Sequence, residues 1–406
     1  MYEHTCFYHD RAKFCQIILN LCASSQFGYT NSVETLQRED TAGSLIGLTT
    51  EEIRARAVEA GLPAYRGTQA AEWLYRRLQP ERGGGYGADF LSMTDLPLDV
   101  RTLFAEKFSA LPLLLTTAQT DPHDGTVKAL ARLADGGHPI ECVLLPDDKR
   151  VSVCLSTQAG CPMGCTFCAT GTQGLTRNLS AGEIVSQFLL LQSLSARRIS
   201  HIVFMGMGEP LLNYEATLKA IRILNSECGI AMRHITVSTV GIVPNIDKLA
   251  EEDLQLTLAV SLHAPNDTLR TRLVPVNKTY PLERLMASCR SYARRTGRRL
   301  TFEYVLLKGV NDEPEHAREL SLLIRGMGAA VNIIPYNPTT VAEAFGRPEQ
   351  ARIVKFRQVL EHAGIVVTQR KERGRQIAAA CGQLVTEAAR SRPVSRILSM
   401  APAKAV

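Results

Sequence analysis

Three cysteines in one short stretch are the residues of this sequence whose chemistry is clearest. Cys161, Cys165 and Cys168 are spaced C-x3-C-x2-C, and glycines and a proline surround them. Three thiolates on one tight loop can bind three irons of a [4Fe–4S] cluster and leave the fourth iron open to a small molecule. A structural zinc site would need four ligands, usually in two separated pairs, and no second pair follows. The spacing therefore predicts an iron–sulfur site.

The cysteine spacing, with Phe167 directly before the last cysteine, resembles the radical S-adenosylmethionine (SAM) superfamily. The resemblance implies that the amino and carboxylate groups of SAM bind the open iron. It also implies that an electron from the cluster cleaves SAM to methionine and a 5′-deoxyadenosyl radical. Cys154 before the loop and Arg177-Asn178-Leu179 after it extend the match.

Composition sets limits on the class of protein. A chain of 406 residues with 45% hydrophobic residues suits a core of barrel size plus an accessory piece. No apolar run approaches the roughly 18 residues of a membrane span, and no secretory signal opens the sequence, so we expect a cytoplasmic protein without membrane contact. Eleven cysteines favour metal binding or thiol chemistry over a secreted disulfide scaffold. The net charge of +6 is compatible with an RNA partner and equally with a solvated basic surface.

Three segments precede the cysteine loop. Residues 1–45 show no clear period and are expected to be a disordered extension. Helical patterns at 48–62, 68–78 and 98–108 predict a helical accessory domain over 46–108, whose arginines suit RNA binding as well as a solvated surface. Residues 109–150 alternate in short runs broken by Asp-Gly turns, which predicts a linking β-meander of about three strands.

From residue 151 onward, predicted strands and helices alternate, which is typical of a parallel α/β sheet. Six strand–helix units are two short of a closed eight-unit barrel, so we expect an open (β/α)6 TIM-type partial barrel over 151–370. A C-terminal segment, 371–406, follows it and ends in a mobile tail. The expected strands are 151–155, 201–207, 235–240, 256–262, 300–307 and 331–335, and the expected helices are 180–194, 214–225, 281–295, 315–326 and 348–363.

Polar residues follow several of these strands, at the end of the sheet where active sites gather. The second strand leads into Gly206–Pro210, where glycines permit close backbone approach to a ligand and Glu209 can accept hydrogen bonds from an ammonium group. Ser238-Thr239, Ser261–Asn266 and Pro335–Pro338 follow the third, fourth and sixth strands. Each group alone is compatible with an ordinary turn. Together they suit a bound polar cofactor.

Two further cysteines stand outside the cluster motif. Cys154 lies on the first barrel strand, so it can face the same cavity as the cluster loop. Cys381 lies in a segment of small residues, where a cysteine is usually an inert apolar filler. Gly374 and Gly382 would let that segment bend back over the mouth of the barrel. The basic run 370–375 before it suits contacts with phosphates and equally a solvated surface.

The cysteines, the Gly-Glu-Pro segment, Ser261–Asn266 and Ala380–Gln383 together resemble the RlmN family of dual-specificity RNA methyltransferases over about 46–384. The resemblance implies methylation of carbon 2 of an adenosine in 23S rRNA, at the peptidyl transferase centre, and of an anticodon-adjacent adenosine in tRNAs. It also implies the site residues. These are cluster ligands Cys161, Cys165 and Cys168, SAM ligands Gly208, Glu209, Ser238, Ser261, Leu262, His263 and Asn337, methyl carrier Cys381, its partner Cys154, and proton acceptor Glu141.

The resemblance also implies a two-stage reaction that uses two SAM molecules per turnover. Carbon 2 of adenine is electron-poor, so the hypothesis is that Cys381 first takes a methyl group, which the radical then activates for addition to the base. Glu141 would take the carbon-2 proton. Cys154 would attack the Cys381 sulfur and release the RNA as a disulfide forms. We expect a monomer that receives electrons from a donor such as flavodoxin or ferredoxin.

Three alternatives stay open. A relative that methylates carbon 8 and confers antibiotic resistance shares the cysteines, although Glu209-Pro210 and His263–Asn266 follow the carbon-2 pattern. A radical SAM enzyme with a protein or small-molecule substrate would not need the two extra cysteines or the basic run. A non-enzymatic iron–sulfur RNA-binding protein would have no use for the polar residues at the strand ends.

Overall fold

The computed structural model describes residues 43–77, 90–109, 112–134, 137–339 and 344–384. These all belong to one compact unit, Ala42–Val406. Residues 1–42 of the expected extension 1–45 and the expected tail from 385 lie outside the described residues, whereas Leu45 is buried in the main core. Within the described residues, no helix is both long and apolar enough to cross a membrane.

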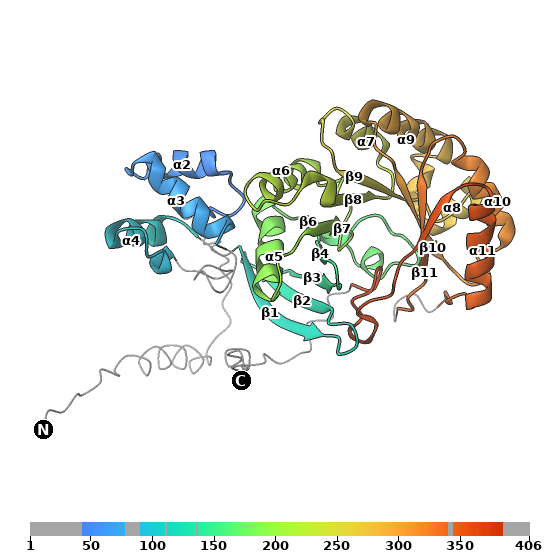
Figure 1. Cartoon of the computed structure of the whole chain (residues 1–406), viewed down its shortest axis with the longest axis horizontal. Coiled ribbons are helices and arrows are strands. Elements are labelled where there is room, and N and C mark those ends of the chain that lie inside the picture. The colour runs from blue at the N-terminus through green and yellow to red at the C-terminus, as the bar shows by residue number, and fades with distance from the viewer. Residues whose placement is uncertain (1–42, 78–89, 110–111, 135–136, 340–343, 385–406) are drawn as a thin grey trace, which may run out of the picture. The chain divides into compact units, whose positions relative to one another are not determined.

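A single ten-stranded sheet organises the molecule, in the order β1-β2-β3-β4-β7-β8-β9-β10-β11-β12 (Figure 1). The pairs from β1 to β4 are antiparallel, and every pair from β4 to β12 is parallel. The strands are β1 (Leu113–Thr120), β2 (Val127–Leu133), β3 (Pro139–Pro146), β4 (Val151–Cys154), β7 (His201–Phe204), β8 (Ile235–Thr239), β9 (Thr257–Ser261), β10 (Thr301–Leu306), β11 (Ala330–Pro335) and β12 (Val366–Gln369). The expected α/β fold with its six parallel strands is confirmed.

Two features of the sheet differ from the expectation. The meander does not merely link two domains, because β3 pairs with β4 and so continues the barrel sheet. A further parallel strand, β12, pairs with β11. Its four residues are half-exposed at the edge of the sheet. An edge strand needs neither continuous apolar character nor regular alternation, so the sequence gives little sign of β12.

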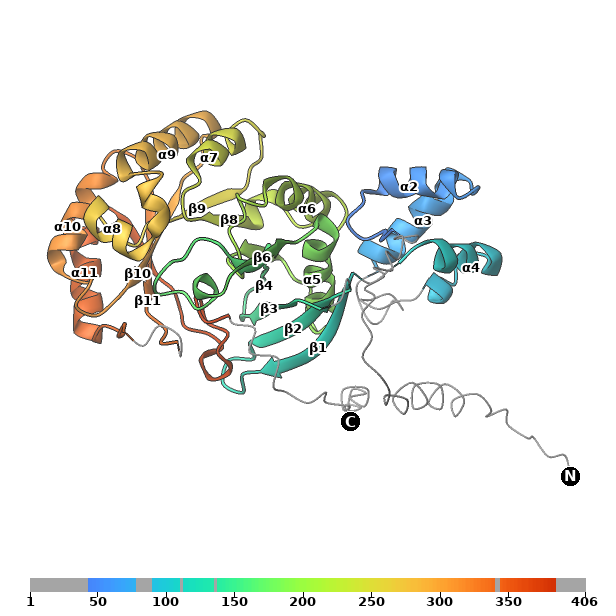
Figure 2. The ribbon, with the colours of Figure 1, turned by 180° about the vertical axis from the view of Figure 1, so that it is seen from behind.

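Helices cover the outer face of the curved parallel sheet (Figures 1 and 2). Five of these helices lie where they were expected. The helices α7 (Val243–Leu249) and α8 (Asp267–Leu273) were not expected, because each has seven residues, which are too few to show a helical period. The helices of this part of the chain are α5 (Ala181–Ser193), α6 (Tyr214–Ser226), α7 (Val243–Leu249), α8 (Asp267–Leu273), α9 (Leu282–Thr296), α10 (Pro314–Leu323) and α11 (Gln350–His362).

The strands alternate strictly between the two faces of the sheet. Apolar side chains such as Val153, Ile202, Val237 and Phe302 face outward and form the main core under the helices. Their neighbours along each strand therefore face the interior of the barrel. Cys142, Cys228 and Cys289 are buried in the main core, as the apolar character of their surroundings predicts.

The N-terminal helices α2 (Thr50–Glu59), α3 (Ala64–Tyr75) and α4 (Leu98–Lys107) lie where they were expected. A capping box begins α2, because Thr49 and Glu52 each accept the other's backbone N–H. Gly47 packs directly on Gly182 of α5, where an added Cβ would lie 2.5 Å from the Gly182 Cα. An ion pair of 2.7 Å from Lys219 to Glu52 adds a second attachment, to α6. The helices are thus fixed to the outside of the barrel.

Candidate active site

The cluster loop follows β4 as a small hairpin of β5 (Gln158–Cys161) and β6 (Gly174–Asn178). Cys161 ends the first hairpin strand, and Cys165 and Cys168 lie in the connection. Gly160 allows the two strands to approach, because an added Cβ would lie 2.0 Å from the Gly174 carbonyl oxygen. The sequence thus places all three thiols on the wall of one cavity.

The three thiols suit a cluster better than a single ion. Burial raises the pKa of all three, that of Cys161 to about 12, so a bound cation is needed to hold them as thiolates. Within the described part of the chain, no three Cys, His, Asp or Glu side chains lie close enough together to hold one metal ion. A cubane cluster binds each thiolate at a different iron, so its ligands are spread more widely.

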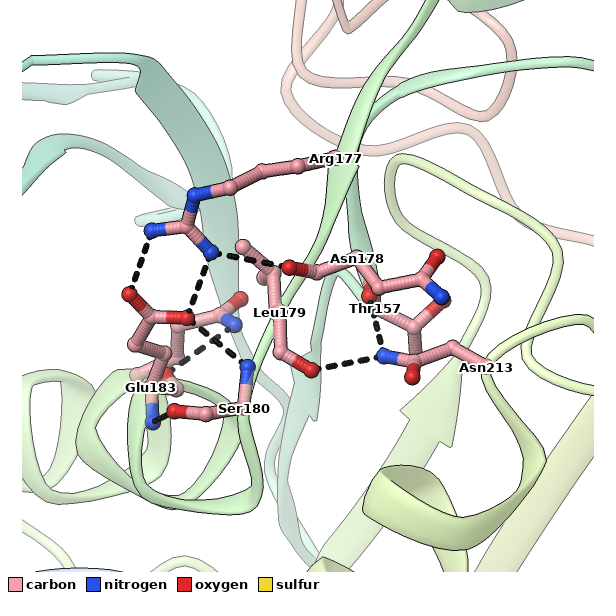
Figure 3. A network of polar contacts seen from close by, with 8 residues as sticks. Thr157, Arg177, Asn178, Leu179, Ser180, Glu183 and Asn213 are labelled. Carbon is pink, nitrogen blue, oxygen red and sulfur yellow. Dashed lines mark hydrogen bonds and ion pairs between the residues drawn. The ribbon is translucent and has the colours of Figure 1, made fainter.

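A network of polar contacts fixes the stem of the hairpin to the helices beside it (Figure 3). The Asn213 side-chain N–H group donates to the carbonyl oxygens of Thr157 at 2.8 Å and Leu179 at 2.7 Å, one on each side of the hairpin. Arg177 donates to both carboxylate oxygens of Glu183 at 2.9 and 2.6 Å. The segment that contains Arg177 therefore positions the loop, at some distance from the three thiols.

The Gly206–Pro210 loop lies against the hairpin and lines the same cavity. Gly208 has a φ of +100° and packs on Gln158, whose Cβ would lie 2.6 Å from an added Cβ. Gln158 Oε1 also accepts the Glu209 N–H at 2.8 Å. The buried Glu209 carboxylate accepts N–H groups of Leu211 at 3.0 Å and Val240 at 2.8 Å. Burial outweighs these bonds and raises the pKa of Glu209 to about 7.

Ser238, Ser261, His263 and Asn337 line this cavity too. His263 has a φ of +59°, and its Nδ1 accepts the Val305 N–H at 3.1 Å. Burial, with a contribution from Arg270, lowers the pKa of His263 to about 3, so the ring is neutral and Nε2 carries its proton. The buried Asn337 Oδ1 has no hydrogen-bond partner among the described residues. An unsatisfied acceptor on the cavity wall is what a polar ligand would complete.

Leu262 is the one predicted SAM ligand whose side chain lies away from this cavity. It is fully buried in the main core because it follows the inward-facing Ser261 and so faces outward. Its backbone N–H donates to the Glu303 carbonyl oxygen. Only its backbone remains next to the ligand-binding residues.

Cys154 and Cys381 share a second cavity, which adjoins the first. Cys381 lines both cavities, whereas Cys154 lines only the second. The C-terminal segment reaches this place by folding back across the sheet (Figure 2). The Gly374 N–H donates to Asp124 at 2.9 Å, and Thr170 donates to the Leu384 carbonyl oxygen at 2.7 Å. A residue remote in sequence is thereby placed between the cluster cysteines and Cys154.

Both cysteines are free thiols in the described structure, so the expected disulfide is not a feature of it. Burial raises the pKa of Cys154 to about 12 and raises that of Cys381 as well, although the Arg370 guanidinium opposes both shifts. Both residues are therefore protonated, neutral thiols.

Glu141 lies beside these cavities but lines neither of the two. It is buried on β3, on the same face as Val143, which does line the second cavity. Its Oε1 pairs with Lys128 Nζ at 3.2 Å, and the same Nζ donates to the Ala378 carbonyl oxygen at 3.5 Å. Lys128 therefore connects Glu141 to the segment that carries Cys381.

Two inward-facing charged residues of the site were not predicted as such. Arg370 lines the second cavity, although its basic run suited phosphate contacts and equally a solvated surface. Glu303 is 4% exposed on the wall of the first cavity. A lone acid in the apolar run 300–307 was the only sign of Glu303. The rest of the basic run is partly neutralised, because Arg373 pairs with Asp147 at 2.9 Å and Glu372 pairs with Arg347.

Comparisons with known proteins agree with this geometry. Residues 155–320 match the model of the radical SAM superfamily. The chain is 48% identical over 341 residues to a probable dual-specificity RNA methyltransferase RlmN of Thermosynechococcus vestitus, covering 84% of this chain and 97% of the relative. It is 46% identical over 352 residues to a probable RlmN of Trichormus variabilis, covering 85% and 94%. The crystal structure of a radical SAM methyltransferase from Sphaerobacter thermophilus superposes with a TM-score of 0.79 at 48% identity, covering 84% of this chain and 98% of that one.

Proposed function

Because the chain belongs to the RlmN family of dual-specificity RNA methyltransferases, we propose that it methylates carbon 2 of adenosine by way of a methyl group carried on Cys381. As a family member it acts on adenosine in rRNA and tRNA. We propose the 23S rRNA of the peptidyl transferase centre and the anticodon-adjacent adenosine of tRNAs as its targets. The observation that supports the Cys381 route best is that this residue lines both cavities.

Membership of the radical SAM superfamily implies an iron–sulfur cluster and SAM. We propose that Cys161, Cys165 and Cys168 hold a [4Fe–4S] cluster. Bound together, the cluster and SAM supply a radical strong enough to remove a hydrogen atom from an unactivated methyl group. The proposed SAM contacts are Gly208, Glu209, Ser238, Ser261, His263, Asn337 and the backbone of Leu262.

Two cysteines divide the work of methyl transfer. The Cys381 thiol takes a methyl group from one SAM by displacement and loses its proton, since the thiolate is the nucleophile. After a hydrogen atom is removed from this methyl group, its carbon bonds to adenine carbon 2 and links protein to RNA; carbon 2 then gives up its proton, and the adduct gives up one electron, which the redox cofactor would take. Cys154, as its thiolate, then attacks the Cys381 sulfur; the sulfur–carbon bond breaks, its electron pair passes to the carbon, which takes a proton from solvent, and the disulfide forms. A second SAM is needed per turnover because the first only donates the methyl group.

Glu141 is the proposed acceptor of the carbon-2 proton. Pairing with Lys128 suits a carboxylate, which is the form that can accept a proton. Since Lys128 also contacts the Cys381 segment, it connects Glu141 with the segment of the methyl carrier. We further propose that a reducing protein such as flavodoxin or ferredoxin supplies the electrons, and that the enzyme acts as a monomer in the cytoplasm.

Glu209 makes the binding of SAM depend on pH. Its pKa of about 7 means that it is ionised above that pH and becomes neutral as the pH falls, which removes the partner of the SAM ammonium group. The KM for SAM should therefore rise about tenfold per unit below pH 7. Glu209→Gln should raise this KM roughly 10- to 100-fold at pH 8 and abolish the acid-side dependence.

The exposed Glu215→Gln on α6 is the matched control and should leave the KM for SAM unchanged. Steady-state kinetics at pH 6, 7 and 8 give the KM for SAM of the wild-type protein, Glu209→Gln and Glu215→Gln. Identical pH dependence in the wild-type protein and Glu209→Gln would remove Glu209 from SAM binding.

The site of methylation tests the function itself. Reconstituted protein, SAM, a reductant and a 23S rRNA fragment should yield 2-methyladenosine, as identified by mass spectrometry of nucleosides against both methylated standards. 8-Methyladenosine would assign the chain to the activity of the carbon-8 relative. Release of 5′-deoxyadenosine without any methylated nucleoside would indicate a substrate other than RNA.

A further inference from the structure

The second cavity contains an arginine among mostly apolar groups. Apolar side chains of β3 and of the C-terminal segment line this cavity, and they form one buried cluster with Cys154. Arg370, which directly follows β12, lines the same cavity as Cys154 and Cys381. Its backbone N–H donates to the Ile333 carbonyl oxygen of β11 at 2.9 Å, which fixes the residue beside the sheet. The cavity of the two thiols therefore includes a positive charge.

The Arg370 guanidinium has no carboxylate within ion-pair distance among the described residues. Its one side-chain hydrogen bond there runs from Nη1 to Met205 Sδ at 3.2 Å, and a thioether is a weak acceptor. The other two cations of this cavity differ, because Arg373 is paired with Asp147 at 2.9 Å and Lys371 is exposed to solvent. Arg370 is therefore the cation whose charge can act inside the cavity, where screening by water is weak.

Met205 connects Arg370 with Cys154. It directly follows β7, in which Val203 is paired with Cys154 across the parallel strands. The Met205 backbone N–H donates to the Cys154 sulfur, and the Met205 side chain accepts from Arg370. Burial raises the pKa of Cys154 to about 12, and the Arg370 guanidinium is the largest influence that opposes this rise. Arg370 therefore lies close enough to Cys154 to change its ionisation.

The release of the RNA needs a form of Cys154 that is scarce. A pKa of about 12 leaves roughly one molecule in ten thousand as the thiolate at pH 8, and the thiolate is the form that attacks a sulfur. In the free enzyme, a charge on Cys381 also repels a charge on Cys154. Once Cys381 is bonded to the RNA carbon, its sulfur is a neutral thioether and this repulsion is absent. At that stage the charge of Arg370 acts on Cys154 alone.

We propose that Arg370 stabilises the Cys154 thiolate when the RNA is released. The Cys154 thiol gives its proton to solvent, and the thiolate sulfur bonds to the Cys381 sulfur as the bond from that sulfur to carbon breaks. The electron pair of the broken bond goes to the carbon, which takes a proton from solvent. Arg370 acts through Cys154 and is a positioning residue. The inference rests on the proposed function and adds to it the group on which release depends.

The remaining titratable groups around Cys154 and Arg370 include no other unpaired cation. They are a thiol and two acids, namely Cys142 of β3, Glu303 of β10 and Glu372. Burial raises the pKa of Cys142, so this thiol stays neutral. Glu372 is paired with Arg347. Glu303 attracts the guanidinium from β10, and its Oε2 accepts from the Asn332 side chain at 2.8 Å. None of these groups can take the place of Arg370 beside Cys154.

Arg370→Gln tests the proposal, because it removes the charge and keeps a polar side chain. The protein is first methylated on Cys381 and then reacted in a single turnover with a saturating 23S rRNA fragment. The covalent adduct, followed on denaturing gels, should form at the wild-type rate and decay about 3- to 50-fold more slowly. An opposite charge changes the ionised fraction of an acid about 10- to 1,000-fold. The more basic thiolate is a better nucleophile and recovers about half of that change on a logarithmic scale.

Two further variants separate the charge from the side chain that carries it. Arg370→Lys keeps the charge and should release the RNA within about threefold of the wild-type rate. Arg373→Gln is the matched control, because Arg373 lines the same cavity but its charge is neutralised by Asp147. It should leave the rate of release unchanged. All three variants should retain the iron content of the wild-type protein.

A second measurement needs neither RNA nor SAM. In the Cys381→Ala background, peptide mass spectrometry gives the rate at which iodoacetamide alkylates Cys154 between pH 7 and pH 9. This rate should rise about tenfold per pH unit, because it follows the thiolate fraction. At each pH, adding Arg370→Gln should lower it about 3- to 50-fold, whereas adding Arg370→Lys should not.

Four results would overturn the proposal. The first is a normal rate of release in Arg370→Gln, and the second is an equal slowing of release by Arg370→Gln and Arg370→Lys. The third is a higher KM for RNA with normal release, which would assign Arg370 to a phosphate contact. If Arg370→Gln fails to bind iron, Arg370→Lys decides alone, and slow release with slow alkylation in that variant is the fourth. An absence of adduct in both the wild-type protein and Cys154→Ala would instead refute the proposed function, while alkylation would still show whether Arg370 acts on Cys154.

Discussion

Replacing Cys381 with alanine will abolish methylation of RNA. Among the described residues, Cys381 carries the one thiol that lines both cavities, so without it no methyl group can be carried to the base. The change is small, since Ala379 and Ala380 already precede the position, so the fold should persist. Mass spectrometry of nucleosides should find no methylated adenosine, and the protein should show no gain of a methyl group on incubation with SAM.

The control is Cys228→Ala, which removes a buried thiol from the main core far from both cavities. It should retain RNA methylation, and both variants should retain the iron content of the wild-type protein. Methylated adenosine from Cys381→Ala above the background of a no-enzyme reaction would exclude the carrier role.

Replacing Cys154 with alanine should instead trap the enzyme on its product. The methyl group would still be carried and would still bond to the base, but no second thiol would attack the Cys381 sulfur. Most of the active protein should therefore accumulate as a covalent adduct with RNA. A shifted band on a denaturing gel that collapses on ribonuclease treatment identifies it, and peptide mass spectrometry should locate the adenosine on Cys381.

The double variant Cys154→Ala/Cys381→Ala provides the control, because it should form no adduct. Multiple turnovers by Cys154→Ala without any adduct would show that another group releases the product. That result would leave the shared cavity without the function proposed for it.

The helices and strands could be predicted wherever a segment shows a clear apolar pattern along its length. The parallel strands are apolar on the face that packs under the helices, so their positions were visible in the sequence. β12 and α7 and α8 were not predicted, because short elements at an edge or between strands show too little period. The pairing of β3 with β4 depends on tertiary contacts that no local pattern records.

The residues of the candidate site also divide into those that the sequence revealed and those that it did not. The cluster cysteines, Glu209 and His263 were recognisable because they lie in loops whose composition serves the site. Glu303 and Arg370 depend on which face of a strand points inward, so a lone charge in a buried strand or a basic run conceals them. Leu262 shows that a place inside a matching motif does not decide where a side chain points, since its side chain lies in the main core and only its backbone is left for the proposed contact.

One measurement tests the account most directly: mass spectrometry of nucleosides from RNA incubated anaerobically with reconstituted protein and trideuteromethyl-SAM. The Cys381 route predicts 2-methyladenosine with two deuterium atoms, because the carried methyl group loses one to the radical and gains a hydrogen from solvent. Three retained deuterium atoms would mean that the methyl group moves to the base intact, and this would contradict the route through Cys381.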